Sequence, residues 1–254
     1  MAARGPAAET PTNLFVTNMF VIVSSMTPRP THESRRERPA KPALSHDRIV
    51  AAAVRVMRTE GLRRVTMRRL ATELDTGPAS LYVYVANTAA LHAAVLEELL
   101  GEVDLGPVAA PGEWRERLAA VLVSYTRVLF AHPELAHSAL VARPAGPHYL
   151  ALVEGVLALL HEGGVPGGQA AWGVDVLLQV ATATAAEQSA RQDDDAAKEE
   201  HHALVRALAE APPGTHPRIA ALGDDLTSGT PHQRLRWIFQ AVVNGTSATP
   251  REAT

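Results

Sequence analysis

The sequence contains no cysteine, so neither a disulfide nor a thiolate metal site or nucleophile can form. Aromatic residues make up only 4% of its 254 residues, and no apolar run is long enough to span a membrane. Among the 24 cationic side chains only Lys41 and Lys198 are lysines. Alanine and leucine dominate instead, and they favour helices over strands. We therefore expect an all-α protein.

The longest early apolar run, LFVTNMFVIV over residues 14–23, has about half the length of a membrane span. It has the size of a secretory h-region, but one Arg and one Glu precede it and no A-x-A cleavage pattern follows. Met19 and Met26 leave a later start open. Residues 1–43 lack helical periodicity and are rich in Pro, Thr, Ser and Ala, so we expect a disordered extension.

Charge divides the chain into a basic front and an acidic rear. Residues 1–88 carry 13 Lys/Arg against 7 Asp/Glu, whereas residues 89–254 carry 11 against 20. Only the front is therefore expected to meet a polyanion.

Helical periodicity begins near Leu44. Ser45 is a suitable N-cap, and apolar residues at i, i+3, i+4, i+7 and i+8 from Ile49 form one stripe. Gly61 is placed to end this first helix.

A tight break follows within TMRRLATELDTGPASLYVYVANTAAL, residues 66–91. Thr66 is expected to cap a second helix, and Pro78 begins a short third helix that ends near Val85. Two short helices joined by such a turn form a helix-turn-helix, whose second helix enters the major groove of DNA. A plain helical hairpin in an α-helical core has the same spacing, so spacing alone leaves both interpretations open.

The stretch LSHDRIVAAAVRVMRTEGLRRVTMRRLATELDTGPASLYVYVANTAALHAAVLEEL resembles the N-terminal DNA-binding domain of the TetR family of transcriptional regulators. Its most specific pieces are GL..VTMRRLA.EL and G..SLY.YV.N...L. The later segments WRERLAAVLVSYTRVLFAHPELA, HPRIAALGDDL and LRWIFQAVVNG are similar to the regulatory domain of the same family. The resemblance implies a three-helix helix-turn-helix domain followed by a helical regulatory and dimerisation domain.

We expect an extension over residues 1–43, a DNA-binding domain over 44–104 with its helix-turn-helix at 66–85, a regulatory domain over 105–245 and a disordered tail over 246–254. The Gly/Pro-rich DLGPVAAPGE, residues 104–113, marks the main boundary. A fourth helix is expected from about Thr88 to Val103. The later helices are expected at Glu113–Ala131, Pro133–Ala142, Pro147–Gly163, Pro166–Arg191, Ala196–Ala211 and Pro231–Val243.

Small residues at the start of the third helix would let it approach base edges closely, and the preceding helix begins with two arginines. The resemblance extends the expected DNA contacts to tyrosines and threonines that reach phosphates. The expected contacts are Thr66, Arg68, Arg69, Gly77, Pro78, Ala79, Ser80, Tyr82, Tyr84 and Thr88.

Two positions depart from the family pattern. Tyr84 stands where the family often has His, and Thr88 stands where it usually has Lys. The loss of a cation predicts a slightly lower affinity and a weaker salt dependence. Basic residues of the extension are candidates for a minor-groove arm, against the alternative of a solvated leader. These residues are Arg35, Arg36, Arg38 and Lys41.

The resemblance also implies a homodimer in which the helices over 166–191 and 231–243 pair with their mates. Leu177, Ala181, Trp237 and Phe239 are the expected interface residues. Polar or aromatic groups on otherwise apolar helices are candidates for an effector pocket. They are Tyr125, His137, Trp172 and Gln179.

Asp195, Glu199 and His202 have a spacing that a metal site could use, but a solvated acidic surface is the expectation, and we predict no metal or cofactor. The chain has no G-x-S-x-G, H-E-x-x-H or Walker-type motif, so we predict no enzymatic activity.

We predict a regulator that acts in the cytoplasm on the nucleoid, binding a palindromic operator in double-stranded DNA as a homodimer, without contacting a membrane. It is expected to be a repressor that an unknown small-molecule effector releases. A DNA-binding regulator controlled by its abundance or by a protein partner has the same sequence signals. A helical enzyme or scaffold with a helical hairpin is the remote alternative.

Overall fold

The computed structural model describes residues 43–140, 144–193 and 195–251. The extension and its candidate arm, up to Pro42, lie outside these residues. Within the described residues the protein is entirely helical, without a strand, which confirms the predicted fold class. None of the described helices is both long enough and apolar enough to cross a membrane.

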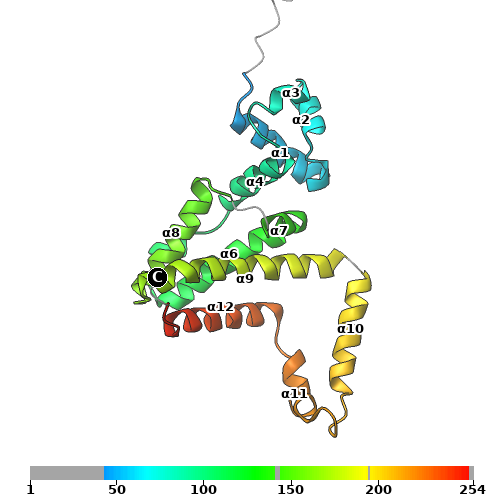
Figure 1. Cartoon of the computed structure of the whole chain (residues 1–254), viewed down its shortest axis with the longest axis vertical. Helices are drawn as coiled ribbons and strands as arrows, with labels where there is room; N and C mark the ends of the chain where they lie inside the picture. The colour runs from blue at the N-terminus through cyan, green and yellow to red at the C-terminus, as the bar shows by residue number, and fades with distance from the viewer. Residues whose placement is uncertain (1–42, 141–143, 194, 252–254) are drawn as a thin grey trace, which may run out of the picture. The chain divides into compact units, whose positions relative to one another are not determined.

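The N-terminal part of the described chain forms a helical head. Its first helix, α1, begins after Ser45, whose hydroxyl accepts a hydrogen bond from the Arg48 N–H, and ends at Gly61, where φ is 86°. Both caps confirm the sequence prediction. The head comprises α1 (His46–Glu60), a 3-10 turn η1 (Leu62–Arg64), α2 (Met67–Glu73), α3 (Pro78–Leu81) and α4 (Thr88–Leu100) (Figure 1).

The turn between α2 and α3 is held by two backbone hydrogen bonds. The Thr76 N–H donates to the Ala71 carbonyl at 2.9 Å, and the Asp75 N–H donates to the Thr72 carbonyl at 3.2 Å. This pattern is a Schellman motif, which requires a left-handed residue just after the helix. Asp75 fills that position with φ at 49°, the one non-glycine residue with positive φ in the described chain.

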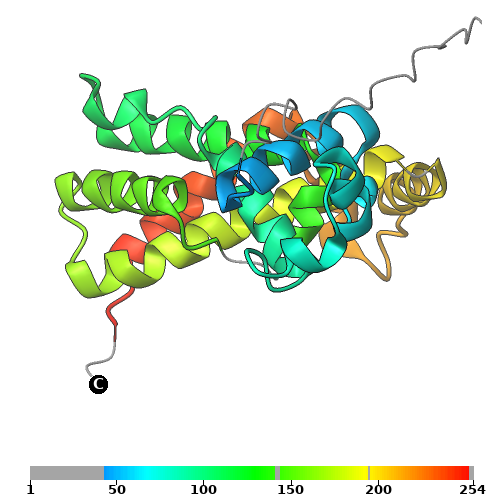
Figure 2. The same ribbon diagram turned by 90° about the horizontal axis from the view of Figure 1, so that it is seen from above.

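The remaining helices form the regulatory body. The helices of the body are α5 (Gly106–Ala109), α6 (Trp114–Phe130), α7 (Pro133–Ala139), α8 (Pro147–Glu162), α9 (Gly167–Asp193), α10 (Asp195–Ala209), α11 (Pro217–Thr227) and α12 (Pro231–Ala248). Helix α9 lies at the centre of the body, since α6, α7, α8 and α12 all pack on it (Figures 1 and 2).

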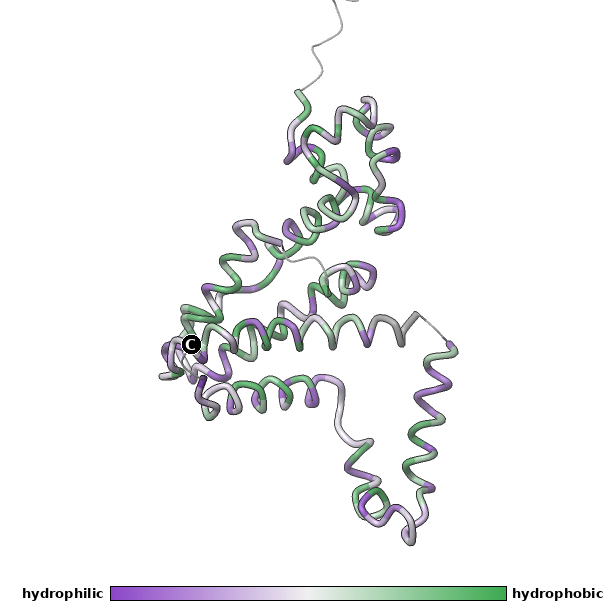
Figure 3. The backbone as a smooth tube through the Cα atoms, viewed as in Figure 1, coloured by the Kyte–Doolittle hydropathy of each residue, from purple (hydrophilic) through white to green (hydrophobic). Residues whose placement is uncertain are grey.

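Helices α10 and α11 pack on each other, and α10 meets the end of α9. Neither contains a buried residue in this chain. Along α10 the hydrophilic and hydrophobic colours alternate in Figure 3, as in an amphipathic helix. Leu204, Leu222 and Leu226 on these two helices are exposed.

Helix α12 differs from the prediction at its C-terminal end. It continues past Val243 to Ala248, so residues 246–248 are helical and not part of a disordered tail. The Gln169 side-chain amide donates hydrogen bonds to the backbone carbonyls of Thr246, Ser247 and Thr249. These bonds satisfy carbonyls that the end of a helix leaves without partners.

Helix α4 packs on both sides of the predicted boundary at residue 104. It contacts α1 in the head and α6, α7 and α8 in the body. One continuous cluster of buried apolar residues runs from Ile49 through Leu91 and Val95 to Phe239. The described residues, 43–140, 144–193 and 195–251, accordingly belong to one compact unit.

We predict that Asp75→Val lowers the free energy of unfolding by about 1–2 kcal/mol, because a β-branched side chain is strained at positive φ. Asn tolerates this conformation, so Asp75→Asn should retain nearly all of the stability. Urea denaturation of both variants measures the difference. Equal stability of the two variants would show that the left-handed turn places no demand on residue 75.

Candidate DNA-binding surface and regulatory cavity

The head presents the first turn of α3 to solvent. Leu81 is fully buried and Val85 is nearly so, and together they anchor α3 to the core. Gly77, Pro78, Ala79 and Ser80 are all exposed ahead of that anchor. The predicted small residues therefore form one accessible edge, suited to close approach by DNA.

Two tyrosines extend this edge. The side chains of Tyr82 and Tyr84 are 53% and 42% exposed, so both hydroxyls are accessible to phosphate oxygens. Thr88, also exposed, is the first residue of α4, after Asn87, whose side chain caps that helix at 2.8 Å from the Ala90 N–H. Val83, which the sequence analysis did not single out, is 79% exposed between the tyrosines and adds apolar surface.

Thr66 and Arg68 flank the same region from α2. The Thr66 hydroxyl accepts a hydrogen bond from the Arg69 N–H at 3.2 Å, which leaves its own hydrogen free to donate. Arg68 is exposed, and its guanidinium makes no hydrogen bond or ion pair with another described residue. Its charge is thus available to a phosphate or to a guanine.

Arg69, also a predicted DNA contact, is paired within the head. Its guanidinium pairs with Glu60 at 2.6 Å and with Glu73 at 3.0 Å, which ties α2 to the end of α1. The hydrogen bonds that Arg69 donates to Glu60 and Glu73 raise the pKa of Arg69, and the bond that Glu60 accepts lowers the pKa of Glu60. We propose that Arg69 braces the head internally instead of contacting DNA.

A small cavity lies in the body beside α4. Tyr125 and Gln179 line it as predicted, together with Leu96 and Leu100 of α4 and Tyr149 of α8. The cavity volume is about 80 Å³. Inside it the Tyr125 hydroxyl lies 2.7 Å from the Thr182 hydroxyl, and burial raises the pKa of Tyr125.

The other two predicted pocket residues lie elsewhere. Trp172 is 59% exposed on the outer face of α9, with the Arg251 guanidinium 4.7 Å from its ring centroid. His137 is exposed on α7, where its ring lies 3.4 Å from the Pro133 carbonyl. The periodicity of their helices did not reveal which face each residue occupies.

Of the four predicted interface residues, three are buried within the protomer and one is exposed. Leu177, Ala181 and Phe239 are almost completely buried within one protomer, so they belong to its own core and do not face a partner. Trp237 is 68% exposed on α12. The exposed apolar residues of α9 are Trp172 and Val176, which the sequence analysis did not assign to an interface.

Polar contacts connect the head to the body. Arg58 of α1 pairs with Glu102, just after α4, at 2.5 Å. Glu134 of α7 accepts hydrogen bonds from both the backbone N–H and the side chain of Arg63 in η1, at 3.1 and 2.8 Å. Glu97 of α4 accepts hydrogen bonds from two N–H groups in the first turn of α8, at His148 and Tyr149.

The acidic segment around α10 contains no candidate metal cluster within the described residues. Asp195 pairs with Lys198 at 2.7 Å, and Glu199 pairs with Arg206 at 3.1 Å. The hydrogen bond from Lys198 lowers the pKa of Asp195. These carboxylates therefore have cationic neighbours of their own.

Two family models match the chain. The model described as "Bacterial regulatory proteins, tetR family" covers residues 49–95, which contain the exposed α3 edge. The model described as "Tetracyclin repressor-like, C-terminal domain" covers residues 107–234. The chain belongs to the TetR family of transcriptional regulators.

Curated relatives of this TetR-family chain match about half of their own length. An HTH-type transcriptional regulator of Saccharopolyspora erythraea is 38% identical over 136 residues, which are 54% of this chain and 56% of the relative. The HTH-type transcriptional repressor DrrR1 of Streptomyces coeruleorubidus is 34% identical over 131 residues, 52% of this chain and 48% of its own.

Solved structures agree over a larger share of the chain. SCO7704 of Streptomyces, described as a transcription regulator, is 60% identical with a TM-score of 0.71, covering 84% of this chain and 100% of its own. ActR of Streptomyces coelicolor in complex with actinorhodin is 35% identical with a TM-score of 0.70, covering 80% and 95%.

We predict that Arg68→Ala weakens operator binding about five- to a hundredfold, because loss of a charged contact to DNA costs about 1–3 kcal/mol. The matched control Arg69→Ala should lower the thermal midpoint of the protein while leaving the salt dependence of binding unchanged. Fluorescence anisotropy of labelled operator at several salt concentrations measures the affinity and its salt dependence, and thermal denaturation measures the midpoint. The reverse pattern, with Arg69 controlling the salt slope, would contradict the assignment.

We predict that Tyr125→Phe lowers the free energy of unfolding by about 1 kcal/mol, through loss of the hydrogen bond to Thr182. The pKa of Tyr125 is raised in the folded protein, so the unfolded chain releases this proton first and stability falls as pH rises above about 10. The variant should lose less stability over that alkaline range, as measured by urea denaturation. Tyr82→Phe, at an exposed tyrosine, is the control, and identical alkaline profiles for all three proteins would refute the prediction.

Proposed function

We propose that this regulator is a homodimeric repressor that binds a palindromic operator and is released by a small-molecule effector. The observation that carries the proposal is the exposed edge formed by α3, Tyr82 and Tyr84, together with the exposed Arg68 of α2. Small side chains fit base edges, while the hydroxyl groups and the guanidinium fit phosphates. The relative DrrR1 is named as a repressor, which supports repression rather than activation.

Exposed apolar surface supports the homodimer. Trp172 and Val176 on α9 and Trp237 on α12 are all more than two-fifths exposed in a single protomer. Large exposed apolar side chains on adjacent packed helices mark a protein interface. A two-fold dimer places two recognition helices roughly 34–36 Å apart, so that both enter successive major grooves on one side of the duplex.

The shared helix α4 supports release by an effector. Leu96 and Leu100 line the cavity, and the same helix packs on α1 in the head. A ligand that binds more tightly when α4 is displaced would shift the population away from the DNA-binding spacing. ActR, a similar structure, was solved with actinorhodin bound, which supports a small-molecule ligand for this chain.

A second candidate function has its own observation. The cavity of about 80 Å³ is smaller than the roughly 300–1,000 Å³ of ordinary ligand pockets. This favours a DNA-binding regulator that needs no small-molecule effector and is controlled by abundance or by a protein partner. Either function places the protein at the nucleoid in the cytoplasm.

Selection of bound sequences from random double-stranded DNA tests the proposed function. The expected product is an inverted repeat bound by two protomers, with dissociation on addition of an effector from a screened compound collection. Recovery of an inverted repeat that no compound releases would favour the second candidate. Recovery of no shared sequence would refute both.

We predict that Trp237→Glu converts the dimer to a monomer, because a charge in a desolvated interface is strongly unfavourable. Operator affinity should fall by at least about tenfold with it, since one half-site alone remains bound. Leu150→Glu, at an exposed leucine of α8 outside the proposed interface, should remain dimeric. Sedimentation velocity measures the state, and a wild-type monomer or a dimeric Trp237→Glu variant would contradict the proposed interface.

A further inference from the structure

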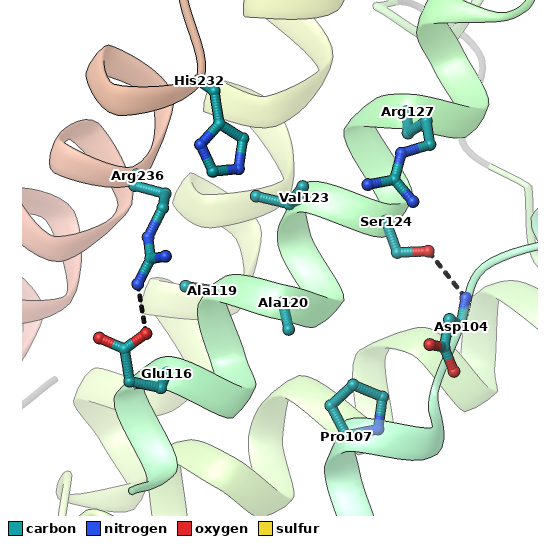
Figure 4. Close-up of a pocket in the computed structure, with 10 residues that line it drawn as sticks. All are labelled: Asp104, Pro107, Glu116, Ala119, Ala120, Val123, Ser124, Arg127, His232 and Arg236. Carbon is teal, nitrogen blue, oxygen red and sulfur yellow. Dashed lines mark hydrogen bonds and ion pairs between the residues drawn. The ribbon is translucent and has the colours of Figure 1, made fainter.

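A second hollow lies along α6, and its lining residues differ from those of the Tyr125 cavity. Figure 4 shows the residues that line it. Its volume is about 350 Å³, within the range of roughly 300–1,000 Å³ that small-molecule sites occupy. Ala119, Ala120 and Val123 of α6 form an apolar wall, and their short side chains leave the space open. The first two turns of α12 and the segment after α4 complete the lining.

Two carboxylates on the rim are already held within the protein. Glu116 forms an ion pair with Arg236 of α12. Asp104 accepts a hydrogen bond from the Gly106 N–H at 2.9 Å, while its own N–H donates to the Ser124 hydroxyl at 2.8 Å. Each of these two carboxylates therefore already has a hydrogen-bonding or ionic partner within the protein.

The basic side chains on the rim have fewer partners. The Arg127 guanidinium and the His232 imidazole make no hydrogen bond or ion pair with any other described residue. In Figure 4 both side chains lie toward the end of the hollow away from Glu116, but on facing walls: His232 lies beside Arg236 on α12, and Arg127 lies on α6. An arginine fork binds carboxylate or phosphate in a bidentate manner, so this end suits an anionic group.

The hollow is independent of the other proposed surfaces. Tyr125 and Ala120 lie five residues apart on α6 and thus point to different sides of the helix. On α12, His232 and Arg236 share the face toward α6, whereas Trp237 points away from it.

We propose that this hollow binds a small organic anion, with its carboxylate or phosphate held by Arg127 and His232. The flat apolar body of such a ligand would lie over Ala119, Ala120 and Val123. This site is separate from the effector cavity, and the proposal does not depend on operator binding.

Calorimetric titration of the full-length protein with benzoate and with phenylphosphate, at low ionic strength and without DNA, tests the site. Saturable binding of both probes is expected, and the neutral analogue benzamide should bind at least about tenfold more weakly, because charge-assisted hydrogen bonds contribute about 1.5–3 kcal/mol. Inorganic phosphate, which lacks the apolar body, should also bind more weakly than phenylphosphate.

Two variants locate the binding. Arg127→Gln should weaken benzoate binding about ten- to a hundredfold. Ala120→Phe keeps every charge but fills the hollow, and should also abolish binding. Arg218→Gln, at an exposed arginine of α11, is the matched control and should bind like the wild type. Circular dichroism and thermal midpoints check that each variant is folded.

The proposal is overturned if neither anion binds saturably, or if benzamide binds as well as benzoate. It is equally overturned if a folded Arg127→Gln or Ala120→Phe variant binds benzoate as the wild type does. Because no DNA is present, each of these results leaves the proposed repressor function standing.

Discussion

Helix α4 is packed on both sides, and this constraint connects the head to the body. Its buried residues Leu91, Val95 and Leu99 belong to a core that continues from the head into the body. Leu96 and Leu100 of the same helix line the Tyr125 cavity. A rigid helix with two buried faces transmits a displacement from one end to the other, because close packing leaves little room for local relaxation.

Polar contacts reinforce that connection at three places. The Glu97 carboxylate accepts hydrogen bonds from two backbone N–H groups of α8. Glu102 forms an ion pair with Arg58, and Glu134 forms one with Arg63. The pairs of Glu102 and Glu134 are substantially exposed, so each adds little stability and is screened by salt. Their importance lies in orientation, since they hold α1 and η1 against the body near the start of α2.

Much of the head could be predicted from local sequence. Ser45, Thr66 and Gly61 end or begin helices through contacts within a few residues, and the structure confirms each. The role of Arg69 could not be predicted in this way, because Glu60 reaches it across the η1 turn. The burial of Phe239 and the exposure of Trp172 likewise depend on how α9 and α12 are rotated against their neighbours. Helical periodicity identifies an apolar helix but not its orientation when several faces are apolar.

The central claim is that the α3 edge of two protomers reads one inverted repeat. Footprinting the full-length regulator on the intergenic DNA beside its own gene tests this most directly. The account predicts protection symmetric about one centre, with half-site centres about 10–10.5 base pairs apart or a multiple of that distance. Protection without this symmetry, or of any sequence equally, would contradict it.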